Sequence, residues 1–451
     1  LLCYFSVKRL RYIYKTARRK LIMPSIKSIK AIQVFDSRGT PTISCRVDLE
    51  SGASYTSMVP SGASTGSREA LELRDGGSTY LGKGVQTAIN NIHSKIAPAL
   101  IGMNVTDQKL IDETMIALDG SDTKSNLGAN AILGVSLAVL GAGAHFNDIP
   151  IYRYVNKIYS DINGVILDMN LPIPMLNIIN GGEHADNNID IQEFMIMPIG
   201  ASSFSEGMQW STEIYAGLKK LLQDKNLSTG VGDEGGFAPN LKSNNEAIEL
   251  IMQAITNNGL RPGIDVSLAL DCAATEFYQD NLYHLKGESS QLTSVELSKY
   301  LESLAAIYPI VSIEDGMDES DFLGWQKLTE ALGEKCQLVG DDLFVTNVKE
   351  LQRGIDESLA NSILIKFNQI GTITETIKTI YLANSNNFTS VISHRSGETE
   401  DTIIADICVG LGAGQIKTGA PCRSDRVAKY NRLLWIEAQN PNLTFAKNVF
   451  N

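Results

Sequence analysis

The sequence has little cysteine, little proline and no excess of basic residues. Its 451 residues include 6 cysteines, 13 prolines and 38 glycines. The cysteines are scattered and form no CxxC pair, which argues against a disulfide framework and is typical of reduced thiols in a cytoplasmic protein. The low proline and glycine content excludes a collagen-like chain. With 43% hydrophobic and 20% charged residues, the chain can bury a core of a small domain plus a larger one.

The charge balance is acidic and uneven. Lys and Arg total 39 against 51 Asp and Glu, a net charge of −12. We therefore expect no direct contact with nucleic acid, which needs a basic surface. Residues 1–22 are the exception, with seven Lys/Arg and no acid. We interpret them as a basic extension outside the fold, with Met23 as the natural start; a targeting or interaction tail is the alternative.

One segment has the length and the lack of charge of a membrane span. Residues 125–147 carry no Asp, Glu, Lys or Arg, and about 20 such residues cross a bilayer. However, Gly and Ala dominate the run, which contains Asn126, Asn130 and Ser136 and lacks a flanking aromatic belt. The sequence therefore predicts a buried helix and no membrane partner.

The first third of the chain predicts an α+β domain. Residues 29–59 alternate apolar and polar side chains around turn signals, which is typical of an antiparallel meander. Residues 85–146 have apolar residues three and four apart, which indicates helices. We assign residues 23–160 to this N-terminal domain.

Residues 161–451 have a different rhythm. Six short β-rich runs each end at a charged residue: Val266–Leu270, Pro309–Ile313, Gln337–Gly340, Ser362–Ile365, Ser390–Ser393 and Gln415–Ile416. Helical patterns such as Thr293–Ala306 and Leu323–Leu332 fill the gaps. Strands alternating with helices predict a parallel sheet, and this many units predict a closed (β/α) barrel. In such barrels the residues at the carboxyl ends of the strands form the active site; the alternative is that each charge only marks a strand meeting solvent.

Three of these strand ends carry carboxylates. Asp271, Glu314 and Asp341 follow consecutive predicted strands. Carboxylates that converge at a barrel mouth repel each other unless a cation joins them. Hard oxygen ligands favour Mg²⁺ over zinc or copper, so these three residues are candidate magnesium ligands.

A lysine ends the next strand. Lys366 stands in the apolar run SILIKFN, and a lysine buried there is costly unless it is paired. It is either a structural ion-pair partner or a general base whose pKa is lowered by burial and by nearby cations such as Lys417.

Several loops add polar groups. The loop 61–69, SGASTGSRE, offers hydroxyls and amides that can close over a phosphate or add a metal ligand, although alone it reads as a turn. A guanidinium in the run His394-Arg395-Ser396 suits a phosphate or carboxylate. Other candidates are Asp233, Glu234, His184, Gln192 and Glu193. Taken singly, the acids could be solvated and the histidine could be packed in the core. Together they indicate a phosphorylated substrate and proton abstraction next to a carboxylate.

Long motifs extend this pattern. They are PSGASTGSREALELRDG, NIINGGEHADNNIDIQEFMIMP, GVGDEGGFAPNL, LALDCAATEF, SIEDGMDESD, LVGDDLFVTN, ILIKFNQIGT, ISHRSGETEDT and GQIKTGAPCRSDRVAKYN. On these motifs the chain resembles the enolases from about residue 24 to about residue 438.

The resemblance implies a fold and a reaction. The fold would be α/β, an irregular (β/α)8 barrel of the enolase TIM type that begins ββαα with one reversed strand, capped by the N-terminal α+β domain. The reaction would be the reversible dehydration of 2-phospho-D-glycerate to phosphoenolpyruvate in glycolysis and gluconeogenesis. That makes the chain a carbon–oxygen lyase.

The resemblance also implies roles for residues. Lys366 would take the C2 proton, and Glu234 would protonate the leaving hydroxyl with help from Glu193 and His184. Two Mg²⁺ would stabilise the enolate intermediate: the first on Asp271, Glu314 and Asp341, the second arriving with substrate and bound by Ser64. The substrate would contact Gln192, His394, Arg395, Ser396 and Lys417.

The chain departs from the enolase pattern away from these positions. Thr40 replaces a usual Asn, and Ile32, Ser44 and Trp435 stand where enolases have residues of subunit-interface ion pairs. We expect a homodimer or higher homo-oligomer held there by apolar packing instead. Two alternatives to an active enolase are a related lyase or racemase for an unphosphorylated acid and a non-catalytic scaffold. The phosphate-binding motifs argue against the first, and the intact catalytic set argues against the second.

Overall fold

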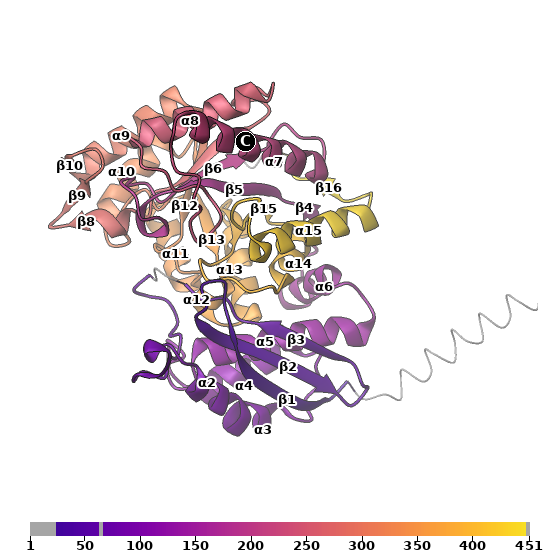
Figure 1. The fold of residues 1–451 in the computed structure, drawn as a ribbon. Coiled ribbons are helices and arrows are strands. Elements are labelled where there is room, and N and C mark those ends of the chain that lie inside the picture. The colour runs from indigo at the N-terminus through magenta and orange to yellow at the C-terminus, as the bar shows by residue number, and fades with distance from the viewer. Residues whose placement is uncertain (1–23, 63–65, 448–451) are drawn as a thin grey trace, which may run out of the picture.

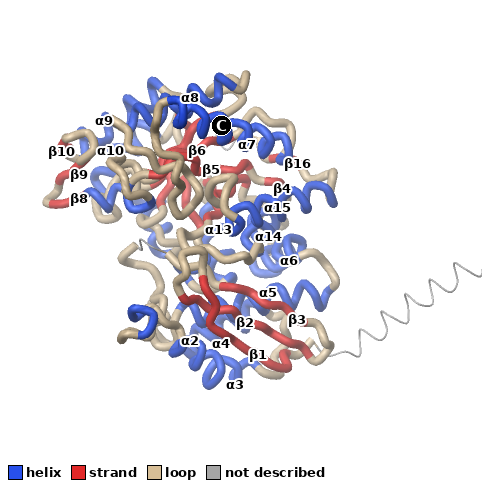
Figure 2. The backbone as a smooth tube through the Cα atoms, viewed as in Figure 1, coloured by secondary structure: helices blue, strands red, loops and turns tan. Residues whose placement is uncertain are grey.

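The computed structural model describes residues 24–62 and 66–447 (Figure 1). The basic extension 1–22 and the predicted ligand Ser64 lie outside these ranges. The chain forms a closed eight-stranded barrel and a smaller domain with its own three-stranded sheet, which Figure 2 shows in red below the barrel. This confirms the predicted fold class.

The N-terminal domain is built on the predicted meander. Strands β1 (Ile26–Phe35), β2 (Pro41–Leu49) and β3 (Ser54–Met58) pair antiparallel in that order. The helices that follow are α2 (Gln86–Asn91), α3 (Ala97–Leu100), α4 (Gln108–Asp119), α5 (Ala129–Asn147) and α6 (Ile151–Asn163). The short helical turn Thr79–Gly82 precedes α2, and the turn Ile92–Ile96 lies between α2 and α3. Residue 160, our predicted domain boundary, lies within α6, and the division itself stays a prediction.

Helix α5 accounts for the uncharged segment. It is long and apolar enough to cross a membrane, but 89% of its apolar 18-residue stretch is buried inside the structure. Its glycines let it pack tightly on β2 and β3. A Cβ at Gly141 would come within 2.2 Å of the Tyr55 ring, and one at Gly134 within 3.3 Å of Cys45 and Val59. The Gly and Ala content therefore reflects close packing on a sheet, and the predicted buried helix is confirmed.

The barrel contains eight strands in the order β5, β6, β7, β11, β12, β13, β14, β15. Their bounds are Ile173–Asn180, Glu193–Met197, Ser267–Asp271, Ile310–Glu314, Gln337–Gly340, Ser362–Ile365, Thr389–Ser393 and Gly414–Lys417. Neighbours are parallel except that β6 runs antiparallel to both β5 and β7. This is the irregular beginning that the resemblance implied.

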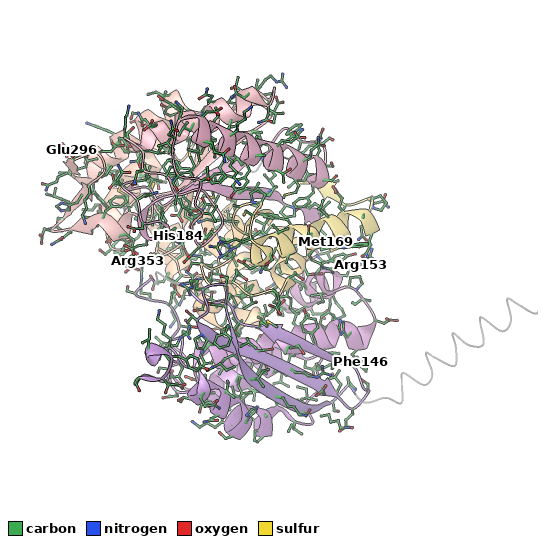
Figure 3. The ribbon with its side chains drawn as sticks, viewed as in Figure 1. Phe146, Arg153, Met169, His184, Glu296 and Arg353 are labelled. Atoms are coloured by element: carbon green, nitrogen blue, oxygen red, sulfur yellow. The ribbon has the colours of Figure 1, made fainter. Side chains whose placement is uncertain are left out.

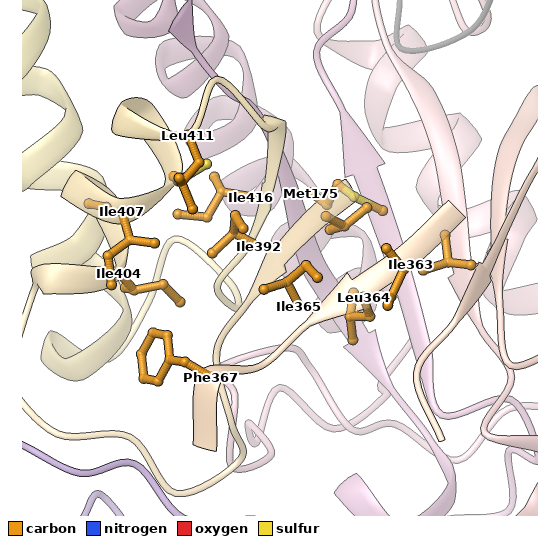
Figure 4. Close-up of a cluster of buried hydrophobic side chains, with 14 of the residues drawn as sticks. Met175, Ile363, Leu364, Ile365, Phe367, Ile392, Ile404, Ile407, Leu411 and Ile416 are labelled. Carbon is orange, nitrogen blue, oxygen red and sulfur yellow. The ribbon is translucent and has the colours of Figure 1, made fainter. Parts of the chain in front are cut away.

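Helices surround the barrel (Figure 1). They are α7 (Phe204–Asp224), α8 (Asn244–Asn257), α9 (Ser294–Ile307), α10 (Phe322–Leu332), α11 (Val348–Glu357), α12 (Phe367–Ile370), α13 (Ile373–Ser385), α14 (Ile403–Gly410) and α15 (Ser424–Gln439). Helices α7 and α8 both precede β7, so the barrel begins ββαα. Ile365, Ile392 and Ile416 of β13 to β15 belong to one buried apolar cluster with Ile407 of α14 (Figure 4). Each such buried side chain contributes about 2 kcal/mol.

All six strands predicted from the sequence are present, within two residues of their predicted ends. We did not predict β5 and β6 because neither run ends at a charged residue: β5 ends at Asn180, and the only acid of β6, Glu193, is its first residue. A small hairpin sheet of β8 (Tyr278–Gln279), β9 (Leu282–Leu285) and β10 (Ser290–Leu292) follows β7 and accounts for the long first interval between predicted strands. The short strands β4 (Asn170–Leu171) and β16 (Thr444–Phe445) pair with each other.

Candidate active site

The charged strand ends meet at one edge of the barrel. Asp271, Glu314 and Lys417 are the last residues of β7, β11 and β15, and Asp341 and Lys366 directly follow β12 and β13. Parallel strands bring such residues together. Eleven of the thirteen predicted site residues line one cavity there: His184, Gln192, Glu193, Glu234, Asp271, Asp341, Lys366, His394, Arg395, Ser396 and Lys417. Glu314 bonds to Lys417 beside this cavity, and Ser64 is outside the described residues.

The reversed strand β6 brings Glu193 to the same edge. Glu193 is the first residue of β6 and pairs in register with Asp271, the last residue of β7. The start of an antiparallel strand lies beside the ends of its neighbours. The rule that barrel sites use carboxyl ends of strands would therefore miss Glu193, and only the family motif pointed to it.

Lys417 is surrounded by carboxylates. Its Nζ lies 2.8 Å from Asp271 Oδ2, 2.8 Å from Glu314 Oε1 and 3.4 Å from Glu193 Oε1, and its side chain is 2% exposed. Burial opposes its charge, but Asp271 and the other carboxylates outweigh burial and raise the pKa of Lys417 well above its usual value. Lys417 is therefore a fixed cation of the site.

Lys366 pairs with Asp341 through Nζ and Oδ2. Burial favours the neutral amine, but Asp341 outweighs it and raises the pKa of Lys366. The sequence left open an ion-pair partner or a base with a lowered pKa: the ion pair is present, and the lowered pKa is wrong for the protein with this ion pair intact. The reason is that Asp341, which we assigned only as a metal ligand, is also the direct partner of the lysine.

Two further acids lie at the same strand ends. Asp315 accepts backbone hydrogen bonds from Asp341 and Asp342, each 2.9 Å long, and has a positive φ of 42°. Carboxylate oxygens of Asp315, Asp341 and Asp342 lie within 4.8 Å of one another. Burial and Asp341 raise the pKa of Asp342 to about 8, and burial and Asp342 raise that of Asp315 well above its usual value. We missed both; the doubled acids at 314–315 and 341–342 were the available signal.

His184, Glu193 and Glu234 form a second group that lines the cavity. His184 (labelled in Figure 3) extends from the loop between β5 and β6, with Nδ1 3.4 Å from Glu193 Oε1 and 3.7 Å from Glu234 Oε2. Burial disfavours the charged ring, but Glu234 and Glu193 raise the pKa of His184 to about 9. Burial and Glu234 raise the pKa of Glu193 to about 7. This group therefore shares protons at neutral pH.

Glu234 is anchored on both sides. Asn177 Nδ2 donates to its Oε2 at 3.1 Å, and His394 Nε2 lies 3.4 Å from its Oε1. Burial opposes its charge, but His394, His184 and Arg426 outweigh burial and hold the pKa of Glu234 well below its usual range. Glu234 is a carboxylate in this state and can accept a proton from His184.

The run 394–396 is held by residues that we did not predict. Arg395 Nη1 donates to Glu69 Oε2 at 2.9 Å, and Arg38 Nη1 donates to Ser396 Oγ at 3.3 Å. Arg426 Nη1 lies 2.5 Å from His394 Nδ1. Glu69 and Arg426 lie inside the recognised motifs, but nothing in the sequence pairs them with these residues.

The donors at this edge fit a hard divalent cation. The side chains of Asp271, Glu314 and Asp341 are buried and offer only oxygens, and carboxylates outnumber the two lysines among them. Burial and Asp271 raise the pKa of Glu314 well above its usual value, which is the strain that a cation would relieve. The cavity volume is about 30 Å³, room for water-sized groups. Asp341 Oδ2 already pairs with Lys366 Nζ, so a cation on Asp341 would compete with the lysine for this carboxylate.

Comparison with known families covers both parts of the chain. Residues 168–447 match the family model described as the enolase C-terminal TIM barrel domain. Residues 26–155 match the model described as the enolase N-terminal domain. Together the matches cover most of the described fold and every described residue of the site. The chain therefore belongs to the enolase family.

Proposed function

We propose that the chain interconverts 2-phospho-D-glycerate and phosphoenolpyruvate, as a phosphopyruvate hydratase of glycolysis and gluconeogenesis. Enolase-type lyase function and a phosphorylated small-molecule substrate follow from the family. The observation that carries the finer proposal is the arrangement of a buried lysine, Lys366, and a proton-sharing group around Glu234 on one cavity. Removal of a proton and departure of a hydroxyl need a base and an acid there.

Lys366 is the proposed base at C2. Burial, Arg395 and Lys417 lower the pKa of Lys366, and Asp341 and Glu314 raise it, with a net rise. Asp341 and Glu314 are both proposed metal ligands, and a cation that engaged them would leave the influences that lower the pKa. A lysine in such surroundings can lose its proton near neutral pH.

Glu234 is the proposed acid for the C3 hydroxyl. The pKa of His184, raised to about 9, keeps its ring protonated at neutral pH, and its Nδ1 lies 3.7 Å from Glu234 Oε2. Glu193, with a pKa of about 7, can replenish this proton. Transfer from His184 to Glu234 readies the carboxyl to protonate the leaving hydroxyl.

Asp271, Glu314 and Asp341 are the proposed residues that would hold Mg²⁺, the usual cation of enolases. A divalent cation at this position stabilises negative charge on the substrate carboxylate. We propose two ions per site, the second arriving with substrate at Ser64.

Arg395 and Ser396 are the proposed phosphate ligands, with His394 beside them. Arg395 is buried and paired with Glu69, so a phosphate would exchange one anionic partner for another. Lys417 is a permanent cation beside Gln192, whose Oε1 is buried without a hydrogen-bond partner in the described structure. We propose that Lys417 and Gln192 orient the substrate carboxylate.

An absorbance assay for phosphoenolpyruvate tests the reaction. We expect turnover of 2-phosphoglycerate with Mg²⁺ and none with excess chelator. A panel with unphosphorylated 2-hydroxy acids separates this activity from that of a related lyase or racemase. Folded, Mg²⁺-loaded protein that turns over none of them would contradict the proposal and favour a scaffold.

We also propose a cytoplasmic homodimer or higher homo-oligomer. Ile32 and Trp435 are each 63% exposed, and burying such side chains against a second copy is favourable. The five described cysteines are free thiols, which suits the cytoplasm. Light scattering at assay concentration tests the oligomer, and a stable monomer would refute it. Cell fractionation tests the location; recovery in a membrane or secreted fraction would refute it.

A further inference from the structure

Arg426, on α15, lies behind the active site and is fully buried. Its Nη1 donates to the backbone carbonyl of Arg395 and its Nη2 to that of Ser396, both at 2.6 Å. Nη2 also donates to the carbonyl of Asp233 at 3.3 Å, in the loop that carries Glu234. One guanidinium therefore joins the proposed phosphate-binding run to the proposed acid loop and is held in one orientation.

The same guanidinium fixes the protonation of His394. A guanidinium has only N–H donors, so His394 Nδ1, 2.5 Å from Nη1, must be the acceptor. A neutral imidazole that accepts at Nδ1 carries its proton on Nε2. Burial lowers the pKa of His394 to about 4, and Arg426 adds to this while Glu234 and Glu398 oppose it. The ring is therefore neutral at physiological pH.

We propose that Arg426 is a positioning residue that locks His394 in the Nε2–H tautomer and thereby orients Glu234 for its role as the acid. His394 Nε2 lies 3.4 Å from Glu234 Oε1 and has no hydrogen-bond partner in the described structure. Its N–H can close on the Glu234 carboxylate and hold it in one orientation. The opposite tautomer would turn a lone pair towards that oxygen and repel it. The effect on catalysis rests on the function proposed above; the tautomer does not.

Lys429 provides a matched comparison. It lies one turn further along α15, is equally buried, and donates to the carbonyls of Thr399 at 2.5 Å and Asp425 at 2.6 Å. It also pairs with Glu398 at 2.9 Å. Lys429 thus supports the same loop without a hydrogen bond to the His394 ring. A purely structural role for Arg426 predicts similar consequences from losing either residue.

Nitrogen NMR of the full-length enzyme with ¹⁵N-histidine tests the tautomer directly. The chain has 5 histidines, and a His394→Gln variant identifies the His394 signal. We expect protonated Nε2 and bare Nδ1 between about pH 6 and 9, unchanged in Lys429→Met and in Arg426→Lys, which retains a donor. We expect Arg426→Met to populate the other tautomer. A proton on Nδ1 of the unsubstituted enzyme, or an unchanged His394 signal in Arg426→Met, would overturn the proposal.

Kinetics test the effect on the acid. In Arg426→Met we expect dehydration of 2-phosphoglycerate to fall roughly 10- to 100-fold, the usual loss when a group that orients a functional histidine is removed. Exchange of the C2 proton with solvent should fall less, because the base is untouched, and Arg426→Lys should restore part of the dehydration rate. Equal losses of both reactions would overturn the role assigned to Arg426. If Arg426→Met does not fold, the NMR spectra and the two rates of the unsubstituted enzyme and of Arg426→Lys test the proposal. An unsubstituted enzyme with the expected tautomer but no turnover would refute the proposed function alone.

Discussion

The two ends of the barrel interior differ in how their buried polar groups are paired. Near the amino ends of the strands, Gln337 and Gln415 exchange hydrogen bonds of 2.7 and 3.0 Å. Ser312 Oγ also donates to Gln337 at 2.9 Å, and Gln337 Nε2 reaches the hydroxyls of Ser362 and Thr389. This glutamine layer is neutral, and its amides find their partners within the fold.

The other end is the barrel mouth, at the carboxyl ends of the strands, where the active-site cavity lies. It is charged, and several of its buried polar atoms have no hydrogen-bond partner in the described structure. His184 Nδ1, Gln192 Oε1 and Glu193 Oε2 are buried without a hydrogen-bond partner in the described structure. Burial and like charges raise the pKa values of Glu193, Glu314 and Asp315 there, whereas neighbouring cations lower those of Glu234 and Asp341. We infer that buried polar groups that are all paired stabilise the fold, whereas unpaired ones remain able to bind a ligand.

Lys366→Ala should have the largest effect. Without the base, both the dehydration of 2-phosphoglycerate and the exchange of its C2 proton with solvent should fall by about 10⁴-fold, the upper range for a general base. Absorbance measures the first reaction, and deuterium incorporation measures the second. C2 exchange that persisted in Lys366→Ala would mean that another residue is the base.

Glu234→Gln should have the next largest effect and should separate the two half-reactions. The amide preserves the shape of the side chain but cannot donate the required proton. We expect dehydration to slow by about 10²- to 10³-fold while C2 exchange slows less. The same two assays give the ratio of the dehydration rate to the C2 exchange rate. If this ratio equals that of the unsubstituted enzyme, Glu234 is not the acid.

Magnesium should stabilise the protein through the mouth alone. At a free Mg²⁺ concentration 100 times the dissociation constant, the free energy of unfolding should rise by about 2.7 kcal/mol. Glu314→Gln should lose most of this increment, whereas a substitution in the glutamine layer should retain it. Urea unfolding with Mg²⁺ or with chelator measures both. An increment unaffected by Glu314→Gln would assign the ion to other residues.

The sequence predicted the barrel and most of the mouth because strand ends and long motifs are local features. Six strands followed from short apolar runs, and the charges after them identified Asp271, Glu314, Asp341, Lys366 and Lys417. The reversed strand β6 could not be derived, since strand direction depends on pairing between distant segments. The pairing of Lys366 with Asp341 and the contact of Arg426 with His394 also join residues far apart in sequence. Local patterns therefore indicate which residues gather, but not which of them share a proton.

The glutamine layer should give the smallest effect and the sharpest contrast. Gln337→Leu removes an amide and leaves Gln415 Oε1 without its 2.7 Å donor, so the free energy of unfolding should fall by about 1–3 kcal/mol. The double variant Gln337→Leu/Gln415→Leu should cost less than the sum of the two single variants, because it removes both members of the amide pair. Urea unfolding of the three variants measures the coupling, and the absorbance assay should find kcat within about twofold of the unsubstituted enzyme. A large loss of kcat with little loss of stability would show that the two ends of the barrel are coupled. It would contradict the division into a glutamine layer that stabilises the fold and a mouth that carries out the reaction.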